Sequence, residues 1–126
     1  MNSLLDSSIL IDYLRRYAKA ESFIDHVSPI NRSISIITAM EIVQGARNTE
    51  SLKLAKLFVN QFNIIYLDKT ISLLAFEILS KNRLVTSLDI SDCLIAATAI
   101  SKDKQLYTRN IKHFQKIFNL KDDQPY

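Results

Sequence analysis

Short apolar segments alternate with longer amphipathic segments along most of this chain, and this alternation most limits its possible folds. The short segments are rich in Ile, Leu and Val, as in buried strands, and the longer ones carry apolar residues three and four positions apart, as in helices. Such an order predicts a parallel sheet covered by helices on both faces, which right-handed crossovers turn into a three-layer α/β/α sandwich. The expected strands are 3–5, 33–37, 63–66 and 105–108, and the expected helices are 6–13, 18–27, 38–46, 51–60, 69–80, 91–101 and 111–118.

The length and composition predict one domain that spans residues 1–126. A chain of 126 residues is the size of a single ordinary domain. Apolar residues make up 48% of it, enough for a sizeable core, and 1 glycine and 2 prolines are too few for a loop-rich fold. The sequence has no internal repeat and no linker-like segment, so we place no domain boundary.

Other general features favour a cytoplasmic protein that acts on a polyanion. The only cysteine, Cys93, excludes an internal disulfide and fits a reducing compartment. No apolar run reaches the roughly 18 residues of a membrane span, and the first residues do not resemble a signal peptide. The chain has 16 basic and 13 acidic residues, and a basic surface around an acidic pocket suits a nucleic-acid substrate.

Four polar side chains stand at the ends of predicted strands or at the starts of predicted helices. Asp6 follows the first strand, Glu41 lies early in the helix after the second strand, and Asn110 follows the fourth strand. Asp92 opens the alanine-rich helix 91–101. Since ligands of open parallel sheets bind at the carboxyl ends of the strands, these side chains can converge there.

Each of these residues also has a purely structural interpretation. Asp6 and Asn110 stand where helix N-caps are expected, and Asp89 is a candidate cap for the helix that contains Asp92. Thr38 to Glu41 fits a capping box. Caps need no particular neighbours, however, whereas these residues lie in sequence blocks that match a known pattern in order.

The sequence resembles the PIN-domain nucleases and, within them, the VapC toxins of prokaryotic toxin–antitoxin pairs. The similarity extends from residue 4 to residue 114 and rests on four blocks. The blocks are residues 4–14 (LLDSSILIDYL), 37–45 (ITAMEIVQG), 92–99 (DCLIAATA) and 106–114 (LYTRNIKHF).

The resemblance implies a role for six residues. Asp6, Glu41 and Asp92 match the family's metal-binding acids. The resemblance also implies catalytic or supporting roles for Ser8, Thr108 and Asn110, the first two as hydroxyls that support the acids. The last position of the fourth motif is often aspartate in the family, and the neutral Asn110 removes one negative charge from the pocket. Asp89 is a nearby acid that could compensate in part.

Carboxylates at one place suit metal-dependent hydrolysis of a phosphodiester. Mg²⁺ or Mn²⁺ activates water and relieves charge on the phosphoryl oxygens, and these hard cations prefer oxygen ligands. The histidines His26 and His113 are expected on the surface, Cys93 is expected in the core, and no zinc-type spacing or phosphate-binding glycine loop is present. Taken with the resemblance, these residues predict a Mg²⁺- or Mn²⁺-dependent endoribonuclease.

Two other functions stay open from the sequence, and partners are expected. A catalytically silent PIN-like module that binds nucleic acid or protein is favoured by Asn110, and a small α/β hydrolase could use the same acids on another phosphate ester. The resemblance implies a homodimer and a cognate antitoxin protein. Apolar residues after Glu41 are either ordinary core or an exposed groove for an amphipathic partner helix: Ile42, Val43, Leu54, Leu57 and Phe58.

Overall fold

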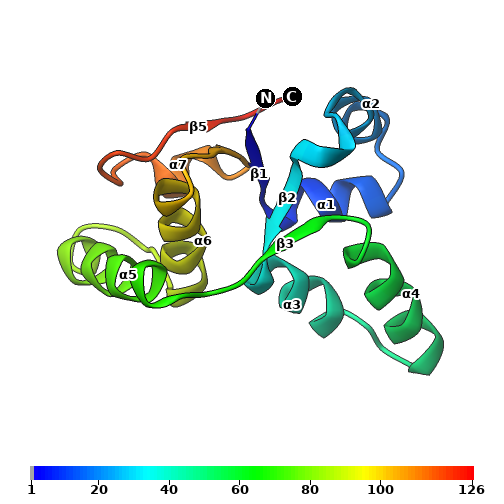
Figure 1. The fold of residues 1–126 in the computed structure, drawn as a ribbon, viewed down its shortest axis with the longest axis horizontal. Coiled ribbons are helices and arrows are strands. Elements are labelled where there is room, and N and C mark those ends of the chain that lie inside the picture. Colours follow the sequence, from blue (N-terminus) through cyan, green and yellow to red (C-terminus); the bar gives the residue numbers. More distant parts are fainter. Residues whose placement is uncertain (1) are drawn as a thin grey trace.

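A computed structural model describes residues 2–126 as a five-stranded parallel sheet between two layers of helices (Figure 1). The predicted α/β/α class is confirmed. The strands are β1 Ser3–Leu5, β2 Arg32–Ser35, β3 Asn63–Ile65, β4 Gln105–Tyr107 and β5 Asp122–Asp123. The helices are α1 Ser7–Leu14, α2 Ala18–His26, α3 Ile36–Gln44, α4 Thr49–Val59, α5 Lys69–Asn82, α6 Ile90–Ser101 and α7 Ile111–Phe114, with a short 3₁₀ helix at Pro29–Asn31. No helix within residues 2–126 is both long and apolar enough to cross a membrane.

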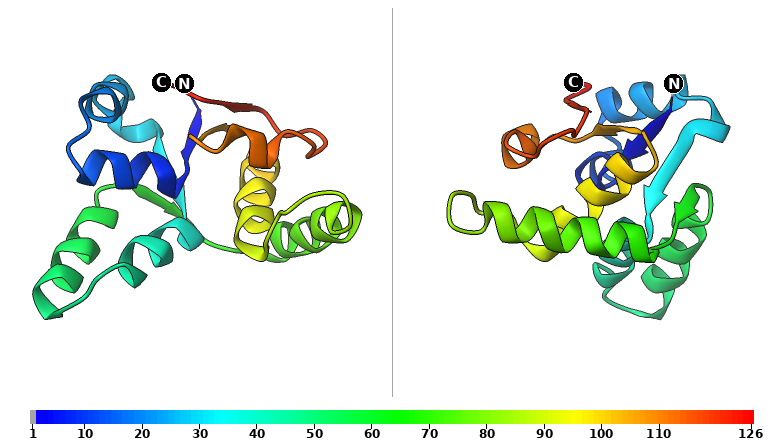
Figure 2. Two further views of the ribbon diagram at one scale, coloured as in Figure 1. Left: turned by 180° about the vertical axis from the view of Figure 1, so that it is seen from behind. Right: turned by 60° about the vertical axis from the view of Figure 1, so that its left-hand side comes forward.

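The sheet separates two hydrophobic cores because its side chains alternate between faces. In β1, Leu4 packs with the residues of α5, α6 and α7, while the next residue, Leu5, packs with those of α1 to α4. Leu106 and Tyr107 of β4 alternate in the same way. The left view of Figure 2 shows from behind how the two groups of helices lie on opposite sides of the strands.

Helix α6 is the central helix of its layer because its side chains are small. Cys93, Ala96, Ala97 and Ala99 are buried, so the backbone can approach both the sheet and the neighbouring helix α5. This close approach holds the first turn of α6 at the edge of the sheet.

The strand order β3-β2-β1-β4-β5 creates a switch point in the middle of the sheet. From β1 the chain moves to β2 and β3 on one side, and then returns to place β4 on the other side of β1. Crevices at the carboxyl ends of strands form where the direction of winding reverses. Asp6 and Thr108, which directly follow β1 and β4, therefore stand at this crevice.

The structure differs most from the prediction at two element ends and in one unpredicted strand. The second strand ends at Ser35 instead of Ile37, because the Ser35 hydroxyl accepts a hydrogen bond from the Ile37 N–H at 3.0 Å and starts α3 two residues earlier. The last helix ends at Phe114 instead of Phe118. Strand β5 was not predicted, since Asp122 and Asp123 have no strand pattern. It forms through backbone bonds of β4, in which Leu106 N–H donates to Lys121 and Thr108 N–H to Asp123.

Candidate active site

Asp6 is the most deeply buried acid of the candidate site. It is 5% exposed and lies between the end of β1 and the start of α1. Its Oδ2 atom accepts hydrogen bonds from the Thr108 hydroxyl at 2.8 Å and from the Ser8 hydroxyl at 3.0 Å. It stands at the N-cap position, but its side chain makes no capping bond, so the structural interpretation as a helix cap does not hold.

The backbone of the loop after β4 orients the two hydroxyls that contact Asp6. The Asn110 N–H donates to the Thr108 hydroxyl at 2.9 Å, and the Arg109 N–H donates to the Ser8 hydroxyl at 3.0 Å. A hydroxyl oxygen that accepts such a bond still has one hydrogen to donate, and here it points to Asp6. This arrangement fixes one of the two carboxylate oxygens of Asp6 and leaves Oδ1 for another partner.

Glu41 faces the same crevice from the second turn of α3. Glu41 is the sixth residue of that helix. The interpretation of Thr38 to Glu41 as a capping box is therefore wrong. Its Oε1 atom is buried and has no hydrogen-bond partner among the described residues. Burial, together with the charges of Asp6, Asp92 and Asp89, raises the pKa of Glu41 from 4.5 to about 7.

Asp92 lies in the first turn of α6, where Asp89 caps the helix. The Asp89 carboxylate accepts from the Asp92 N–H at 2.9 Å, and the Asp92 carboxylate accepts from the Asp89 N–H at 3.3 Å. The capping prediction for Asp89 is confirmed, and Asp92 takes part in the same box. Burial raises the pKa of Asp92, and its Oδ2 lies 3.8 Å from His113 Nδ1.

Asp6, Glu41 and Asp92 together form what we call the acidic site. Burial and, after it, the charges of Asp6 and Asp92 raise the pKa of Glu41, so the three predicted acids lie in one neighbourhood. Within residues 2–126, however, no three His, Cys, Asp or Glu side chains already stand in the geometry of a metal ligand set. The residues present still fit a divalent cation, because Glu41 Oε1 is buried without a partner and Mg²⁺ keeps several waters around one or two carboxylates.

The remaining predicted residues lie as follows. The Asn110 side chain is exposed beside Thr108, at the start of α7, and makes no capping bond. Cys93 is buried in the core as expected, and burial, with the charges of Asp92 and Asp89, raises the pKa of its thiol to about 11. His26 is exposed, as predicted. His113 is also exposed, but its contact with Asp92 was not foreseen.

Sequence reasoning missed a cluster around Arg109. The Arg109 guanidinium donates to Asp12 Oδ2 at 2.9 Å and lies over the rings of Tyr17 and Tyr126, 5.5 and 5.1 Å from their centroids. The Tyr126 hydroxyl donates to the same Asp12 oxygen at 2.9 Å. Burial alone would raise the pKa of Asp12, but these hydrogen bonds lower it. No local signal links these residues, which are separated by about a hundred positions, yet the cluster holds the loop whose N–H groups orient Ser8 and Thr108.

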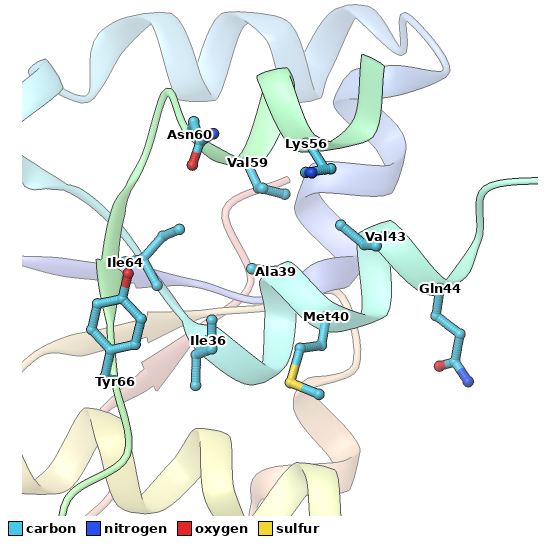
Figure 3. Close-up of a pocket in the computed structure, with 10 residues that line it drawn as sticks. All are labelled: Ile36, Ala39, Met40, Val43, Gln44, Lys56, Val59, Asn60, Ile64 and Tyr66. Atoms are coloured by element: carbon cyan, nitrogen blue, oxygen red, sulfur yellow. The ribbon is translucent and has the colours of Figure 1, made fainter. Parts of the chain in front are cut away.

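An apolar cavity of about 610 Å³ lies between α3, α4 and β3, on the far side of α3 from α6 (Figure 3). Figure 3 shows Met40 and Val43 of α3 and Val59 of α4 along it. The sequence left open whether the apolar residues after Glu41 are core or exposed, and both interpretations apply, each to some of these residues. Ile42 and Phe58 are core, whereas Leu54 and Leu57 are 60% and 58% exposed.

Comparison with known proteins decides the family. The family model described as PIN domain matches residues 3–117. The chain belongs to the PIN-domain family. Among curated relatives, Ribonuclease VapC1 of Methanocaldococcus jannaschii is 34% identical over 123 residues, which cover 94% of this chain and 84% of the relative.

Solved structures of PIN-domain relatives have the same fold over the whole chain. A chain of a toxin–antitoxin complex from Klebsiella pneumoniae is 30% identical, has a TM-score of 0.83 and covers 98% of both chains. A chain of VapBC-1 from nontypeable Haemophilus influenzae is 26% identical, also with a TM-score of 0.83, and covers 99% of this chain and 98% of its own.

Proposed function

We propose that this PIN-domain chain is an endoribonuclease and the toxin of a toxin–antitoxin pair. The observation that carries the proposal is the acidic site, in which a buried, unpartnered carboxylate oxygen of Glu41 stands beside Asp6 and Asp92 at the switch point of the sheet. The names of its relatives, a ribonuclease and toxin–antitoxin complexes, support the same function. We treat residues 1–126 as one nuclease domain and place it in the cytoplasm, where cellular RNA lies.

We further propose that Asp6, Glu41 and Asp92 hold Mg²⁺ or Mn²⁺. Such an ion, when bound, supplies activated water and relief of phosphoryl charge. Asp6 would use Oδ1, because Ser8 and Thr108 already bind Oδ2. Glu41 would hold the ion in its ionised form, so binding would release the proton that its raised pKa favours. Asn110, exposed beside Thr108, contributes an amide oxygen without adding charge.

Purified protein is expected to cleave single-stranded RNA only when Mg²⁺ or Mn²⁺ is present. Excess chelator should lower the rate to background, and re-addition of the cation should restore it, because the carboxylates repel one another and supply no nucleophile of their own. Gel analysis of a labelled RNA over a metal titration measures this. Full activity in chelator contradicts the metal proposal. RNA binding without cleavage at any metal concentration indicates the silent module, and cleavage of other phosphate esters alone indicates a different hydrolase.

We also propose that an antitoxin segment occupies the apolar cavity of Figure 3 and that the toxin is a homodimer. An amphipathic helix fits an apolar groove through residues spaced three and four apart. Met40, which lines the cavity, is 60% exposed, and Leu73 on α5 is exposed to the same extent outside it.

Met40→Lys is therefore expected to lower the affinity for the co-expressed antitoxin by at least about tenfold, because a buried ammonium has no partner there. Leu73→Lys is the matched control and should keep the antitoxin. Each variant is co-expressed with the protein encoded by the adjacent reading frame. Co-purification measures how much of that protein is retained, and light scattering gives the number of toxin copies in the complex. Equal retention by the two variants, or a monomeric toxin, would show that this part of the proposal is wrong.

A further inference from the structure

Three hollows next to the acidic site join into one groove, because they share lining residues. One hollow contains Ser8, Arg15, Arg109 and Asn110. The second shares Arg109 and Asn110 with the first and adds Lys112 and His113. The third shares Lys112 and His113 with the second and ends at Lys116. We call this surface the basic groove, and define it by Arg15, Arg109, Asn110, Lys112, His113 and Lys116.

The charge of the basic groove is almost entirely positive. Among residues 2–126, the only acid that lines it is Asp12, which is already paired with Arg109 at 2.9 Å. Arg15, Lys112 and Lys116 are exposed and form no ion pair within residues 2–126. These three cations are therefore free for an anionic ligand, whereas the guanidinium of Arg109 is held by Asp12, Tyr17 and Tyr126.

The basic groove borders the acidic site through two of its lining residues. Ser8 lines its first hollow and donates to Asp6, and His113 lines the other two and contacts Asp92. Asn110 lines two of the hollows at the point where they join, with Arg15 on one side and Lys112 on the other. An aspartate at this position would put a negative charge in the middle of a path for phosphates. Asn110, which stands where the resemblance implies an acid, is neutral and leaves the path of the phosphates without that negative charge.

We infer that the basic groove binds the backbone of single-stranded RNA, with phosphates on both sides of the scissile bond held by Arg15 and by Lys112 and Lys116. This inference rests on the proposed ribonuclease function and adds the residues that hold the strand on each side of the site. A single strand fits better than a duplex, because Asp6 is almost completely buried and a flexible backbone can bend toward it.

Binding of intact RNA tests the inference apart from catalysis. The probe is a short, mixed-sequence, fluorescein-labelled single-stranded RNA, and the protein is the full chain carrying Asp6→Asn, in chelator, so that the RNA is not cut. Fluorescence anisotropy over a series of KCl concentrations gives the Kd and its salt dependence. In this background, Lys112→Ala/Lys116→Ala and Arg15→Ala are compared with Lys19→Ala/Lys53→Ala, a matched pair of exposed lysines on α2 and α4.

The groove variants are expected to bind more weakly and with a smaller salt dependence. Each phosphate contact that is lost should reduce the slope of log K against log salt by about 0.7, and the double lysine variant should lose about tenfold in affinity near physiological salt. The control pair should bind like the parent. Asn110→Asp should weaken binding in chelator, since it adds a negative charge to the groove.

Three results would overturn the inference. Groove variants that bind with the same Kd and salt slope as the control pair would show that the RNA lies elsewhere. A duplex of the same sequence that competes as well as the single strand would show that the strand assignment is wrong. If either of these two results is found and the wild-type protein still cleaves RNA with metal, only the groove assignment is wrong and the proposed function stands. A wild-type protein that neither binds nor cleaves RNA contradicts the function itself, and the groove with it.

Discussion

Replacing Asp6 with asparagine is expected to lower the rate of RNA cleavage by at least about 1000-fold, which corresponds to roughly 4 kcal/mol of lost transition-state stabilisation. The change removes one of three charges that would hold the cation, at the residue that the structure fixes most firmly. Ser8 and Thr108 can still donate to the amide oxygen, so the hydrogen bonds around position 6 survive. Single-turnover cleavage with saturating Mg²⁺ measures the loss.

The matched control for this change is Asp25→Asn, which alters an exposed aspartate on α2. It should cleave at the wild-type rate, and both variants should unfold at nearly the wild-type denaturant concentration. If Asp6→Asn is folded and cleaves within tenfold of wild type, Asp6 has no essential role and the metal assignment is wrong. If only Asp6→Asn is unfolded, Asp92→Asn, on the more exposed rim of the site, provides the same test.

The metal-free protein is expected to become less stable as the pH rises from about 4.5 to above 7, and Glu41 is the main cause. Its pKa is 4.5 ordinarily and about 7 in the folded chain. Between these values the folded state binds more protons than the unfolded state, so this contribution is fully present below 4.5 and is lost as the pH rises through 7. Because the carboxylate is partly solvated, we discount the shift and expect a loss of about 2 kcal/mol.

Glu41→Gln should remove this pH dependence, since a glutamine carries no proton to lose. In chelator at pH 8 the variant should be more stable than wild type by about the same 2 kcal/mol. Glu50→Gln, at an exposed position on α4, is the control and should retain the wild-type profile. Urea unfolding between pH 4.5 and 8 measures both. Parallel profiles for wild type and Glu41→Gln would contradict a shared acidic site, whereas added Mg²⁺ should stabilise wild type most at high pH because the cation binds the ionised carboxylate.

Much of the acidic site could be predicted from the sequence because strand ends are local features. Asp6 follows an apolar segment directly, and parallel strands place such positions at one edge. Glu41 is different. Its helix starts two residues earlier than the pattern suggested, since the Ser35 cap is invisible to hydrophobic periodicity, and the earlier start decides that Glu41 turns away from a capping role. Its unpartnered Oε1 and raised pKa exist only when α6 and β1 are in place.

The sequence by itself determined the three-layer architecture and much of the two hydrophobic cores. Apolar side chains alternate along strands and repeat every three or four residues along helices, so their pattern indicates which face of each element is buried. It also determined which acids are available. The tertiary structure alone decided the contacts between distant residues. The Arg109–Asp12–Tyr126 cluster, strand β5 and the basic groove each join segments about a hundred residues apart or depend on backbone hydrogen bonds that carry no sequence pattern. Such contacts do not change the local secondary-structure preference of any segment, so they become visible only in the folded structure.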